Sequence, residues 1–437
     1  MLSRFRERLV LVLLALLPFH ALGVTVFTRA IVGVNKPPMG VLALWKEALL
    51  ASILLIAFVE IVRSVGKRAW RFDRYDWCIA VLATALAAAS FLADTSLKQV
   101  VYGIRYDLVP LAAFVVLRRV SWSDSFRRFL PRVFIASVAV AVVYGIATLA
   151  FPASFFSAIG YSDLHSLYVP DGPIAAFQQV GGTSIRRMQG AMSGPNQFGI
   201  WLAMLLPLML TGGRCARRIL APLMLVAIVL SLSRAAWIAA AVIVVLSLWP
   251  QVKKASIVTV VAVCIGIVAA VTALIVVVPS IMVRLESSAD HLRNPLEALS
   301  IMVVSPLGRG LGSAGPANNR VADACVFLEE GSDSSWAAAH PGLCVFVGNA
   351  QVQPADTCTC PLLPENWYLQ LGVEGGWVAM AMFITLIVLV IRRLWPAPFA
   401  QGLLAVAIAG LFLHAWEDAA VAYTVWILCA VAMVSDA

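Results

Sequence analysis

The chain has 437 residues, of which 61% are hydrophobic and only 13% carry a charge. About a quarter of the residues in a typical soluble domain are charged, so this composition excludes a soluble globular protein. It also excludes a disordered or a fibrous one, because the mean hydropathy is +0.91. The remaining class is a polytopic membrane protein, whose apolar exterior is solvated by lipid.

Runs of apolar residues predict the transmembrane helices, since about 20 residues of α-helix cross the hydrocarbon core. The first run resembles a signal peptide, but the many runs behind it favour an uncleaved first helix. The weakest separation is at Ser233–Arg234, where two runs nearly merge. The twelve predicted spans are 9–27, 41–62, 77–93, 100–117, 132–150, 197–211, 218–232, 235–249, 255–278, 367–391, 401–415 and 420–435.

The distribution of Lys and Arg predicts the orientation of these spans. The net charge is +9. With the N-terminus in the cytoplasm, 20 of the 32 basic residues fall on the cytoplasmic side, as the positive-inside rule requires. The excess charge therefore indicates topology rather than nucleic-acid binding, and both termini are expected in the cytoplasm. These residues are Arg4, Arg6, Arg8, Arg63, Lys67, Arg68, Arg71, Arg74, Arg118, Arg119, Arg127, Arg128, Arg132, Arg214, Arg217, Arg218, Lys253, Lys254, Arg392 and Arg393.

Two long segments between the spans fall on the non-cytoplasmic side. The expected fold class is therefore an all-α polytopic membrane protein with about twelve transmembrane helices and two long loops. Functional residues are expected in those loops, because loops on a rigid scaffold commonly carry function. The predicted divisions are transmembrane helices 1–5 in 1–150, a first loop at 151–196, helices 6–9 in 197–278, a second loop with the cysteines at 279–366, and helices 10–12 in 367–437.

Four of the eight cysteines lie in the second long loop. They are Cys325, Cys344, Cys358 and Cys360. An even cluster on an oxidising face predicts disulfides, and Cys358–Cys360 is the least favourable of the possible pairs because the two residues are so close. Zinc, with His340 nearby, is the competing interpretation, but no CxxC pair is present, so we expect no metal.

The first long loop ends with two arginines before a new span. Arg186 and Arg187 are followed by a Gly/Ser/Pro-rich segment and by Pro195-Asn196. Guanidinium groups bind phosphate through two parallel hydrogen bonds, and the following helix N-terminus favours an anion. The sequence therefore predicts an anion site here, with an interfacial anchor and turn as the equally weighted alternative.

Arg234 interrupts about thirty apolar residues, which is costly within a membrane and is usually a sign of function or pairing. A side chain that snorkels to the outer interface is the alternative. Further along, the second loop contains Arg293 and the segment Pro306-Leu307-Gly308-Arg309-Gly310-Leu311-Gly312. That glycine pattern follows no predicted strand, so it indicates a tight turn rather than a dinucleotide site.

The second loop closes with Glu365, Asn366 and Tyr368, at the start of the tenth span. Asn366 is most simply a helix cap. Glu374 lies within the span and is expected to face protein rather than lipid.

Other charged residues and histidines have simpler expected roles. Arg105 with Asp107, and Glu417 with Asp418, are interpreted as local ion pairs or interface groups. His20 and His414 are interpreted as satisfied core or interface histidines rather than ligands.

Taken in order, these motifs resemble the O-antigen ligase / O-antigen polymerase superfamily of bacterial membrane proteins. The resemblance covers about 186–391 and rests on short motifs whose order and spacing match. The motifs are Arg187-x-x-Gly190 with Pro195-Asn196, Ser233-Arg234-Ala235, an Arg293-containing loop helix, the glycine segment 306–312, and Asn366 with Tyr368-Leu369-Gln370 and Glu374-x-Gly376.

The resemblance implies a glycosyltransferase-C-like fold in the bacterial inner membrane, with both long loops and the active site facing the periplasm. It implies transfer of a glycan from an undecaprenyl diphosphate donor to an acceptor hydroxyl, without a cofactor or a metal. Arg187 and Arg234 would hold the diphosphate. Substrate-binding positions would include Arg186, Asn196, Arg293, Arg309, Asn366 and Tyr368.

One departure from the family pattern concerns the expected general base. Ligases of the family usually have His-Asn where this chain has Glu365-Asn366. A carboxylate can also take a proton, so Glu365 is the expected base. The change favours a polysaccharide polymerase slightly over a ligase that acts on lipid A core or protein. A transporter of lipid-linked sugars is the rival class, whereas a purely structural subunit would leave Arg234 unexplained.

Overall fold

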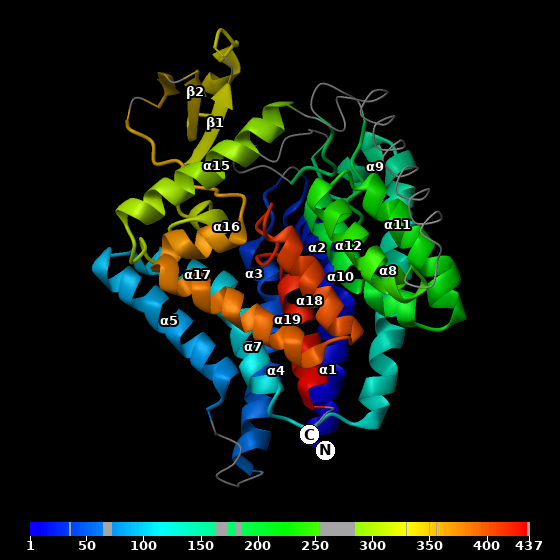
Figure 1. Cartoon of the computed structure of the whole chain (residues 1–437). Coiled ribbons are helices and arrows are strands. Elements are labelled where there is room, and N and C mark those ends of the chain that lie inside the picture. Colours follow the sequence, from blue (N-terminus) through cyan, green and yellow to red (C-terminus); the bar gives the residue numbers. More distant parts are fainter. Residues whose placement is uncertain are drawn as a thin grey trace.

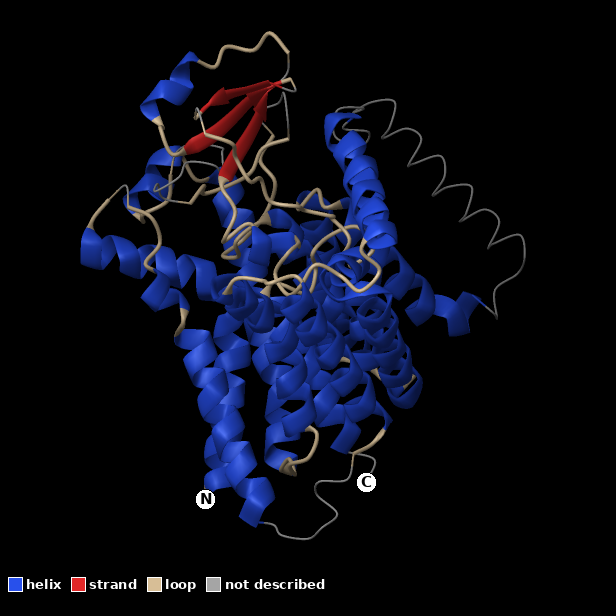
Figure 2. Cartoon of the chain, turned by 90° about the vertical axis from the view of Figure 1, so that its left-hand side faces the viewer, coloured by secondary structure: helices blue, strands red, loops and turns tan. Residues whose placement is uncertain are grey.

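The computed structural model describes residues 1–34, 36–63, 72–162, 174–180, 185–252, 285–328, 330–348, 350–354 and 356–434. The predicted span 255–278 lies outside the described residues, as do parts of both long loops. The described chain is mostly helical, with a small sheet above one end of the helical bundle (Figures 1 and 2).

The helices of the first half follow the predicted spans closely. Long apolar runs form them, and short polar segments separate them. They are α1 (Leu2–Leu16), the 3₁₀ turn η1 (Leu17–Phe19), α2 (His20–Val32), α3 (Gly40–Ala43), α4 (Trp45–Arg63), α5 (Arg74–Leu92), α6 (Leu97–Gly103), the π-helical turn η2 (Ile104–Leu108), α7 (Val109–Leu117), α8 (Asp124–Ala150) and α9 (Ala153–Ala158).

The second half contains the remaining helices and all three strands. They are α10 (Pro195–Thr211), the π-helical turn η3 (Ala216–Leu220), α11 (Ala221–Leu230), α12 (Arg234–Val252), α15 (Leu285–Val304), α16 (Gly315–Asn318), β1 (Ala324–Leu328), the 3₁₀ turn η4 (Ser335–Ala339), β2 (Leu343–Val347), β3 (Ala350–Gln353), α17 (Trp367–Leu394), α18 (Pro398–Ala409) and α19 (Ala419–Val434).

Six helical segments among the described residues are long and apolar enough to cross a membrane, which supports the membrane class. Shorter apolar helices also occur, at Arg234–Trp249, Pro398–Ala409 and Ala419–Val434. The six long segments are Leu2–Val32, Gly40–Arg63, Arg74–Leu92, Leu97–Leu117, Asp124–Ala150 and Trp367–Leu394.

Local breaks in the helices have identifiable causes. Pro18 lies in the 3₁₀ turn between α1 and α2, where proline cannot donate a backbone hydrogen bond. Leu232 has φ = +52° and ends the α11 helix just before Arg234 begins α12, which confirms the predicted separation. Within α17, Gly375 and Gly376 leave the helical conformation. Gly376 has φ = +72°, a value that glycine tolerates best.

The helices pack into one large apolar core. α17 packs on α5, α10 packs on α18 and α12, and α19 packs on α7. Four tryptophans are fully buried in this core: Trp201, Trp367, Trp416 and Trp426. These tryptophans help to pack the C-terminal helices against α10. The helices α10, α17, α18 and α19 form the frame of the site described below.

A small sheet lies in the second long loop of this otherwise helical chain. β1 pairs in parallel with β2, and β2 pairs antiparallel with β3. One face of the sheet forms a small separate core from Leu343, Val345 and Ala337, with Val326 and Leu328 beside it. The strands are rich in valine and phenylalanine, which favour extended structure.

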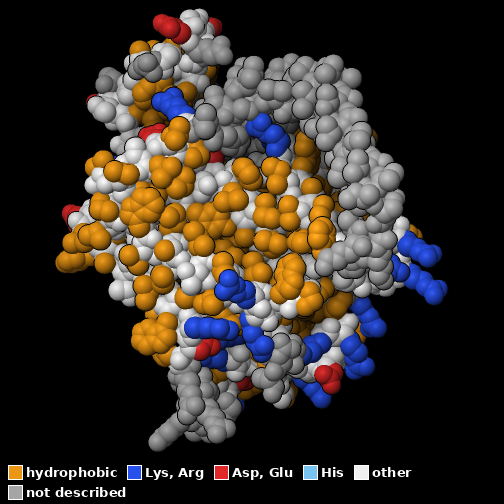
Figure 3. Space-filling model, in the orientation of Figure 1, with side chains coloured by type: hydrophobic (Ala, Val, Ile, Leu, Met, Phe, Trp, Pro, Cys, Tyr) orange, Lys and Arg blue, Asp and Glu red, His pale blue; other side chains and the backbone are white. Residues whose placement is uncertain are grey.

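The two ends of the molecule differ in what they carry. Both termini lie at one end of the bundle and the sheet lies toward the other (Figure 1). On the face shown in Figure 3, hydrophobic side chains form a broad band, and most Lys and Arg side chains lie toward the end with the termini. This arrangement matches the charge bias noted in the sequence.

Candidate functional site

Arg187 is the best-buried arginine of the predicted site, with only 9% of its surface exposed. It joins three separate parts of the chain. Its Nε donates to the Ser231 carbonyl at 3.2 Å, and Nη1 donates to Gln178 Oε1 at 3.0 Å. Its Nη2 donates to Asn196 Oδ1 at 2.7 Å and to the Leu232 carbonyl at 3.4 Å. Arg187 therefore ties the first long loop to α10 and to the α11–α12 turn.

These contacts bring Arg187 close to Arg234, although 47 positions separate them in the sequence. The turn at Ser231 and Leu232 leads directly into α12, whose first residue is Arg234. The Nη2 atom of Arg187 lies within about 10 Å of the Arg234 Cα, given 3.8 Å between successive Cα atoms. The shared site predicted from the sequence is compatible with this geometry.

Two helix N-termini meet at the same place. Pro195 and Asn196 open α10, and Arg234 opens α12. Arg187 touches both starts, through Asn196 and through the Leu232 carbonyl. A helix N-terminus carries a partial positive charge, and the Arg187 guanidinium adds its own charge beside the two starts. The C-terminal end of α11, where the Ser231 carbonyl accepts from Arg187, opposes this positive charge in part. An anion is the ligand that this region favours.

Arg186 points elsewhere, away from this cluster of contacts. Its Nη1 donates to the Phe151 carbonyl at 2.5 Å, and its guanidinium lies 4.1 Å from the centre of the Phe177 ring. The sequence placed Arg186 among the substrate-binding residues, whereas in the structure it binds the first long loop to the end of α8. The contacts indicate a structural role.

Glu365 belongs to a second polar group, at the start of α17. Its backbone has φ = +51°, an unusual value for a residue other than glycine. The Glu365 N–H donates to His414 Nε2 at 3.2 Å. Because Nε2 accepts this bond, His414 carries its proton on Nδ1, which lies 2.7 Å from Gln370 Oε1. Gln370 Nε2 then donates to Glu417 Oε1 at 3.0 Å.

This chain of bonds holds the expected base in position. Unusual backbone conformations persist where the surroundings hold them, and they often occur at functional sites. Here His414 supports the Glu365 backbone, Gln370 fixes the His414 tautomer, and Glu417 orients Gln370. Burial, followed by the charge of Asp107, raises the pKa of Glu417 well above its ordinary value.

Asn366 and Tyr368 have structural contacts of their own. The Asn366 side chain caps α17, because its Oδ1 accepts hydrogen bonds from the Tyr368 and Leu369 N–H groups at 3.0 Å. This is the cap that the sequence predicted. The Tyr368 hydroxyl donates to the Ala407 carbonyl on α18 at 2.7 Å. Both residues therefore fix α17 relative to its neighbours.

A hydrogen bond joins the arginine group to the Glu365 group. Ser193, just before α10, donates to Asp418 Oδ2 at 3.4 Å. Asp418 follows Glu417 directly, and its Oδ1 accepts hydrogen bonds from the Ala420 and Val421 N–H groups at the start of α19. Asp418 therefore caps the start of α19. The starts of α10 and α19 lie side by side, so the two polar groups share one region.

Arg293 and Arg309 lie on other elements. Arg293 is exposed on α15, and the Arg309 side chain is exposed in the glycine segment. The Arg309 N–H donates to the Val373 carbonyl at 2.7 Å, and the Gly310 N–H donates to the Glu374 carbonyl at 2.9 Å. Gly308 and Gly310 have positive φ, as the predicted tight turn requires. The glycine segment thus crosses α17 where that helix breaks.

Asp107 and Glu374 face each other, which corrects the predicted pairing of Arg105 with Asp107. Arg105 instead contacts Glu47, with 2.6 Å between Nη2 and Oε1. Asp107 is 3% exposed and Glu374 is fully buried, as expected for a polar residue that faces protein. Their carboxyl groups lie within hydrogen-bonding reach of each other.

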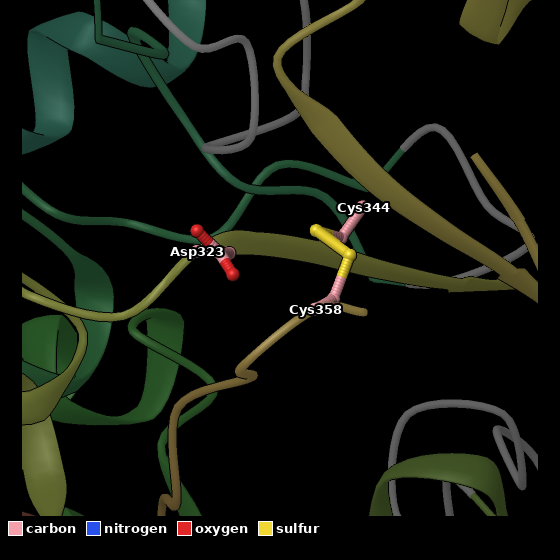
Figure 4. A group of neighbouring side chains, drawn as sticks. All are labelled: Asp323, Cys344 and Cys358. Carbon is pink, nitrogen blue, oxygen red and sulfur yellow. A yellow bond between two sulfur atoms is a disulfide. The ribbon is translucent and has the colours of Figure 1, made fainter. Parts of the chain in front are cut away.

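Two disulfides cross-link the second long loop. Cys325 is bonded to Cys360, and Cys344 is bonded to Cys358. Asp323 lies beside the second bond (Figure 4), and its carboxylate accepts a hydrogen bond from the Thr359 N–H at 2.8 Å. Asp323, Cys344 and Cys358 have their possible ligand atoms close together. The two sulfur atoms are bonded in a disulfide and offer no thiolate to a metal ion, so the three residues do not favour a zinc site.

Several residues of the site were not selected from the sequence. Gln178, Gln370 and Glu417 carry its hydrogen bonds, and His414 was assigned only a core role. One signal was available: Gln370 and Glu374 are four residues apart in an apolar span, a spacing that places two polar groups on one helix face. The partners from other parts of the chain leave no such local pattern.

No model of a known protein family matches the chain, and no relative is found among curated proteins.

Proposed function

We propose that the protein is a membrane glycosyltransferase of the O-antigen ligase and polymerase type. It would move a glycan from an undecaprenyl diphosphate donor to an acceptor hydroxyl at the periplasmic face of the bacterial inner membrane. The positive region around Arg187 and Arg234 is the observation that carries this proposal, because a lipid diphosphate is an anion that enters from the membrane.

In the proposed reaction the acceptor oxygen attacks the anomeric carbon of the donor glycan. The bond from that carbon to the diphosphate oxygen breaks, and the lipid diphosphate leaves as an anion. Fixed positive groups lower the barrier by stabilising the charge that develops on the leaving group. Arg187 keeps the two helix N-termini together, and Arg234, at the first position of α12, is the arginine assigned to the diphosphate.

Glu365 is assigned to take the proton of the acceptor hydroxyl. The backbone that carries this carboxylate is held in place by the hydrogen bond from the Glu365 N–H to His414. The base and the diphosphate site come from different parts of the chain, and the Ser193–Asp418 contact joins them. A general base of this kind contributes about 10²–10⁴-fold to a rate.

The acceptor would be another lipid-linked glycan more readily than lipid A core, since a carboxylate stands at the position of the ligase histidine. The disulfide-bonded sheet of the second long loop stands at the end of the bundle away from the termini (Figure 2). It is a rigid surface on which an acceptor glycan could lie. A ligase acting on lipid A core or protein is the alternative in the same class.

One observation favours a second candidate, a transporter of lipid-linked sugars. Carboxyl groups buried within helices, as Asp107 and Glu374 are, occur in proton relays of pumps and transporters. A transporter would move the lipid-linked glycan across the bilayer without forming a new glycosidic bond.

The full-length protein in lipid nanodiscs, supplied with a polyprenyl-diphosphate glycan, tests the proposal. Glycan chains that lengthen on the lipid support a polymerase, and label transferred to added lipid A core supports the ligase. Donor binding is measured separately by a filter assay. Bound donor with no new glycosidic bond under either condition, together with transbilayer movement in proteoliposomes, would replace the proposal by the transporter.

A further inference from the structure

Asp107 and Glu374 form an unusual pair of acids in the interior of the helical bundle. Asp107 lies in the π-helical turn η2, and Glu374 lies directly before the break in α17. They are 3% and 0% exposed. Local π-helical turns within α-helices frequently mark functional sites.

Neither acid has the partners that a buried carboxylate needs. Among the described residues, no N–H or O–H group makes a hydrogen bond of good geometry to any of the four carboxylate oxygens. The Ala314 N–H is the backbone donor that comes near Glu374. The two carboxyl groups instead face each other.

The charged groups that the structure describes around the pair do not compensate its negative charge. Glu417, from the α18–α19 turn, adds a further acid whose charge acts on both members of the pair. Arg320 acts on Glu417. Arg105, two residues from Asp107, contacts Glu47 on α4.

Two carboxylates in this setting cannot both be ionised. Like charges at close range disfavour ionisation, and burial disfavours it further. One proton held between the two groups removes one charge and converts the contact into a charge-assisted hydrogen bond. The glycine segment covers the pair, because the Gly310 N–H donates to the Glu374 carbonyl and Gly312 packs against Gly103.

A metal ion fits the site less well than a proton does. Hard cations such as Ca²⁺ take six to eight oxygen ligands. Among the described residues, the one group of three potential ligand atoms within 4.8 Å of one another is Asp323, Cys344 and Cys358. The carboxylate of Glu417 therefore does not close around the pair, and two side chains alone form too small a ligand set.

We infer that Asp107 and Glu374 form a proton-binding site in the interior of the helical bundle. The ligand is one proton shared by the two carboxyl groups. This site goes beyond the proposed glycosyl transfer and does not depend on it.

A hydrophobic carbodiimide tests the inference in the full-length protein. Dicyclohexylcarbodiimide reacts with protonated carboxyl groups in apolar surroundings and spares ionised exposed ones. Peptide mapping by mass spectrometry is expected to find the adduct on Asp107 or Glu374 near neutral pH, and less of it as the pH rises. Glu374→Gln should remove at least half of the adduct in this pair, whereas the matched control Glu297→Gln, on the exposed side of α15, should leave it unchanged.

Infrared spectroscopy of the wild-type protein provides a measurement that needs no access for a reagent. A carbonyl band of protonated carboxyl groups is expected near neutral pH, and part of it should vanish in the double variant Asp107→Asn/Glu374→Gln that elutes as a folded protein. If the band is unchanged in the double variant, or absent from the wild type, the inference is wrong. Protection from the carbodiimide by Na⁺, Mg²⁺ or Ca²⁺, with stoichiometric bound metal, would also overturn it in favour of a cation site.

Discussion

The two ends of the helical bundle differ in the partners of their charged side chains. At the end with the termini, bases meet acids: Arg6 contacts Glu60 at 3.0 Å, and Arg118 contacts Asp73 and Asp76 at 2.5 and 2.6 Å. Arg119 adds a contact to Asp76 at 2.5 Å. Here charge is matched in pairs, and the pairs connect α1, α4, α5 and the end of α7.

Toward the other end, the partners are different. Among the described residues there, the matched group is the one in which Lys46 and Arg105 contact Glu47. Beyond it, Arg187 donates to neutral oxygens and Asp107 meets Glu374. Ion pairs within the protein serve its stability, whereas charged groups near a ligand site serve function more often. We therefore expect substitutions to affect stability at the first end and function at the second.

The largest effect is expected from Glu365→Gln. If Glu365 takes the acceptor proton, the amide should retain donor binding while transfer falls by about 10²–10⁴-fold. Transfer to acceptor is measured in nanodiscs, with donor binding measured in parallel. Glu297→Gln, an exposed change on α15, is the control and should behave as the wild type. Near-normal turnover by Glu365→Gln would remove Glu365 from the chemistry and leave it a role at the helix terminus only.

Arg234→Lys should have the next largest effect. Lysine keeps the positive charge but loses the planar pair of donors that matches a phosphate group. Loss of one such stabilising group costs about 10²–10³-fold in rate. We expect normal membrane insertion and a normal unfolding temperature, with transfer reduced to this extent. Arg214→Lys, exposed between α10 and η3, is the matched control.

Arg187→Lys distinguishes two roles of the same site. A lysine cannot reach the acceptors on Gln178, Asn196 and Ser231 together, so this variant should lose stability as well as transfer. If it keeps full stability and full activity, the arginine does not hold the two helix starts together, and the shared diphosphate site is refuted.

Arg118→Ala tests the end of the bundle that holds the termini. Asp76 is 4% exposed and would lose Arg118 while keeping Arg119. The loss should therefore be smaller than the about 3–5 kcal/mol that follows when a buried charge keeps no partner. Chemical unfolding in detergent should show this loss, whereas the folded fraction should transfer glycan at the wild-type rate. A stable variant with poor transfer would break the division between the two ends.

The six long apolar helices among the described residues could be predicted from the sequence, because the bilayer demands that length and composition of a span. The twelve spans as a set stay a prediction. Short-range rules also succeeded: the Ser233–Arg234 step separates α11 from α12, and Asn366 caps α17. The pairing of Arg105 with Asp107 failed for a physical reason, since residues two apart on a helix do not face each other.

Other features depend on contacts between distant segments, and no local sequence pattern predicts them. Arg187 finds its acceptors at Gln178 and Ser231, which are 9 and 44 positions away. The parallel pairing of β1 with β2 is likewise set by the fold of the loop. The positive region around Arg187 could be suspected from its motif, but the meeting of two helix N-termini could not.

The two disulfides are expected to stabilise the sheet by unequal amounts. Removal of a native disulfide from a small unit costs about 2–4 kcal/mol, and more for a longer closed loop. Cys325–Cys360 spans 35 positions and Cys344–Cys358 spans 14, so the first bond should contribute roughly 0.8 kcal/mol more in the loop-entropy account. Protease resistance of serine double variants measures this. Non-reducing mass mapping that finds four free thiols in protein from native membranes would contradict both bonds.

The smallest effect is expected in the pH dependence of stability. Burial and the charge of Asp107 raise the pKa of Glu417, against the opposing hydrogen bond from Gln370. At pH values between the pKa of Glu417 in the unfolded chain and its higher pKa in the folded protein, the native protein holds a proton that the unfolded chain has lost. Stability therefore falls as the pH rises through this interval, and each unit of pKa difference corresponds to about 1.4 kcal/mol.

Glu417→Gln removes this titration but keeps an oxygen that can accept the hydrogen bond from Gln370. The unfolding temperature of the variant should therefore decline less than that of the wild type as the pH is raised from mildly acidic to alkaline. Glu330→Gln, at an exposed position of the second long loop, should follow the wild-type curve. Parallel curves for Glu417→Gln and wild type would mean that Glu417 ionises in the folded protein as readily as in the unfolded chain. The acidic side chains at this end of the bundle would then be compensated by interactions other than the contacts around Gln370.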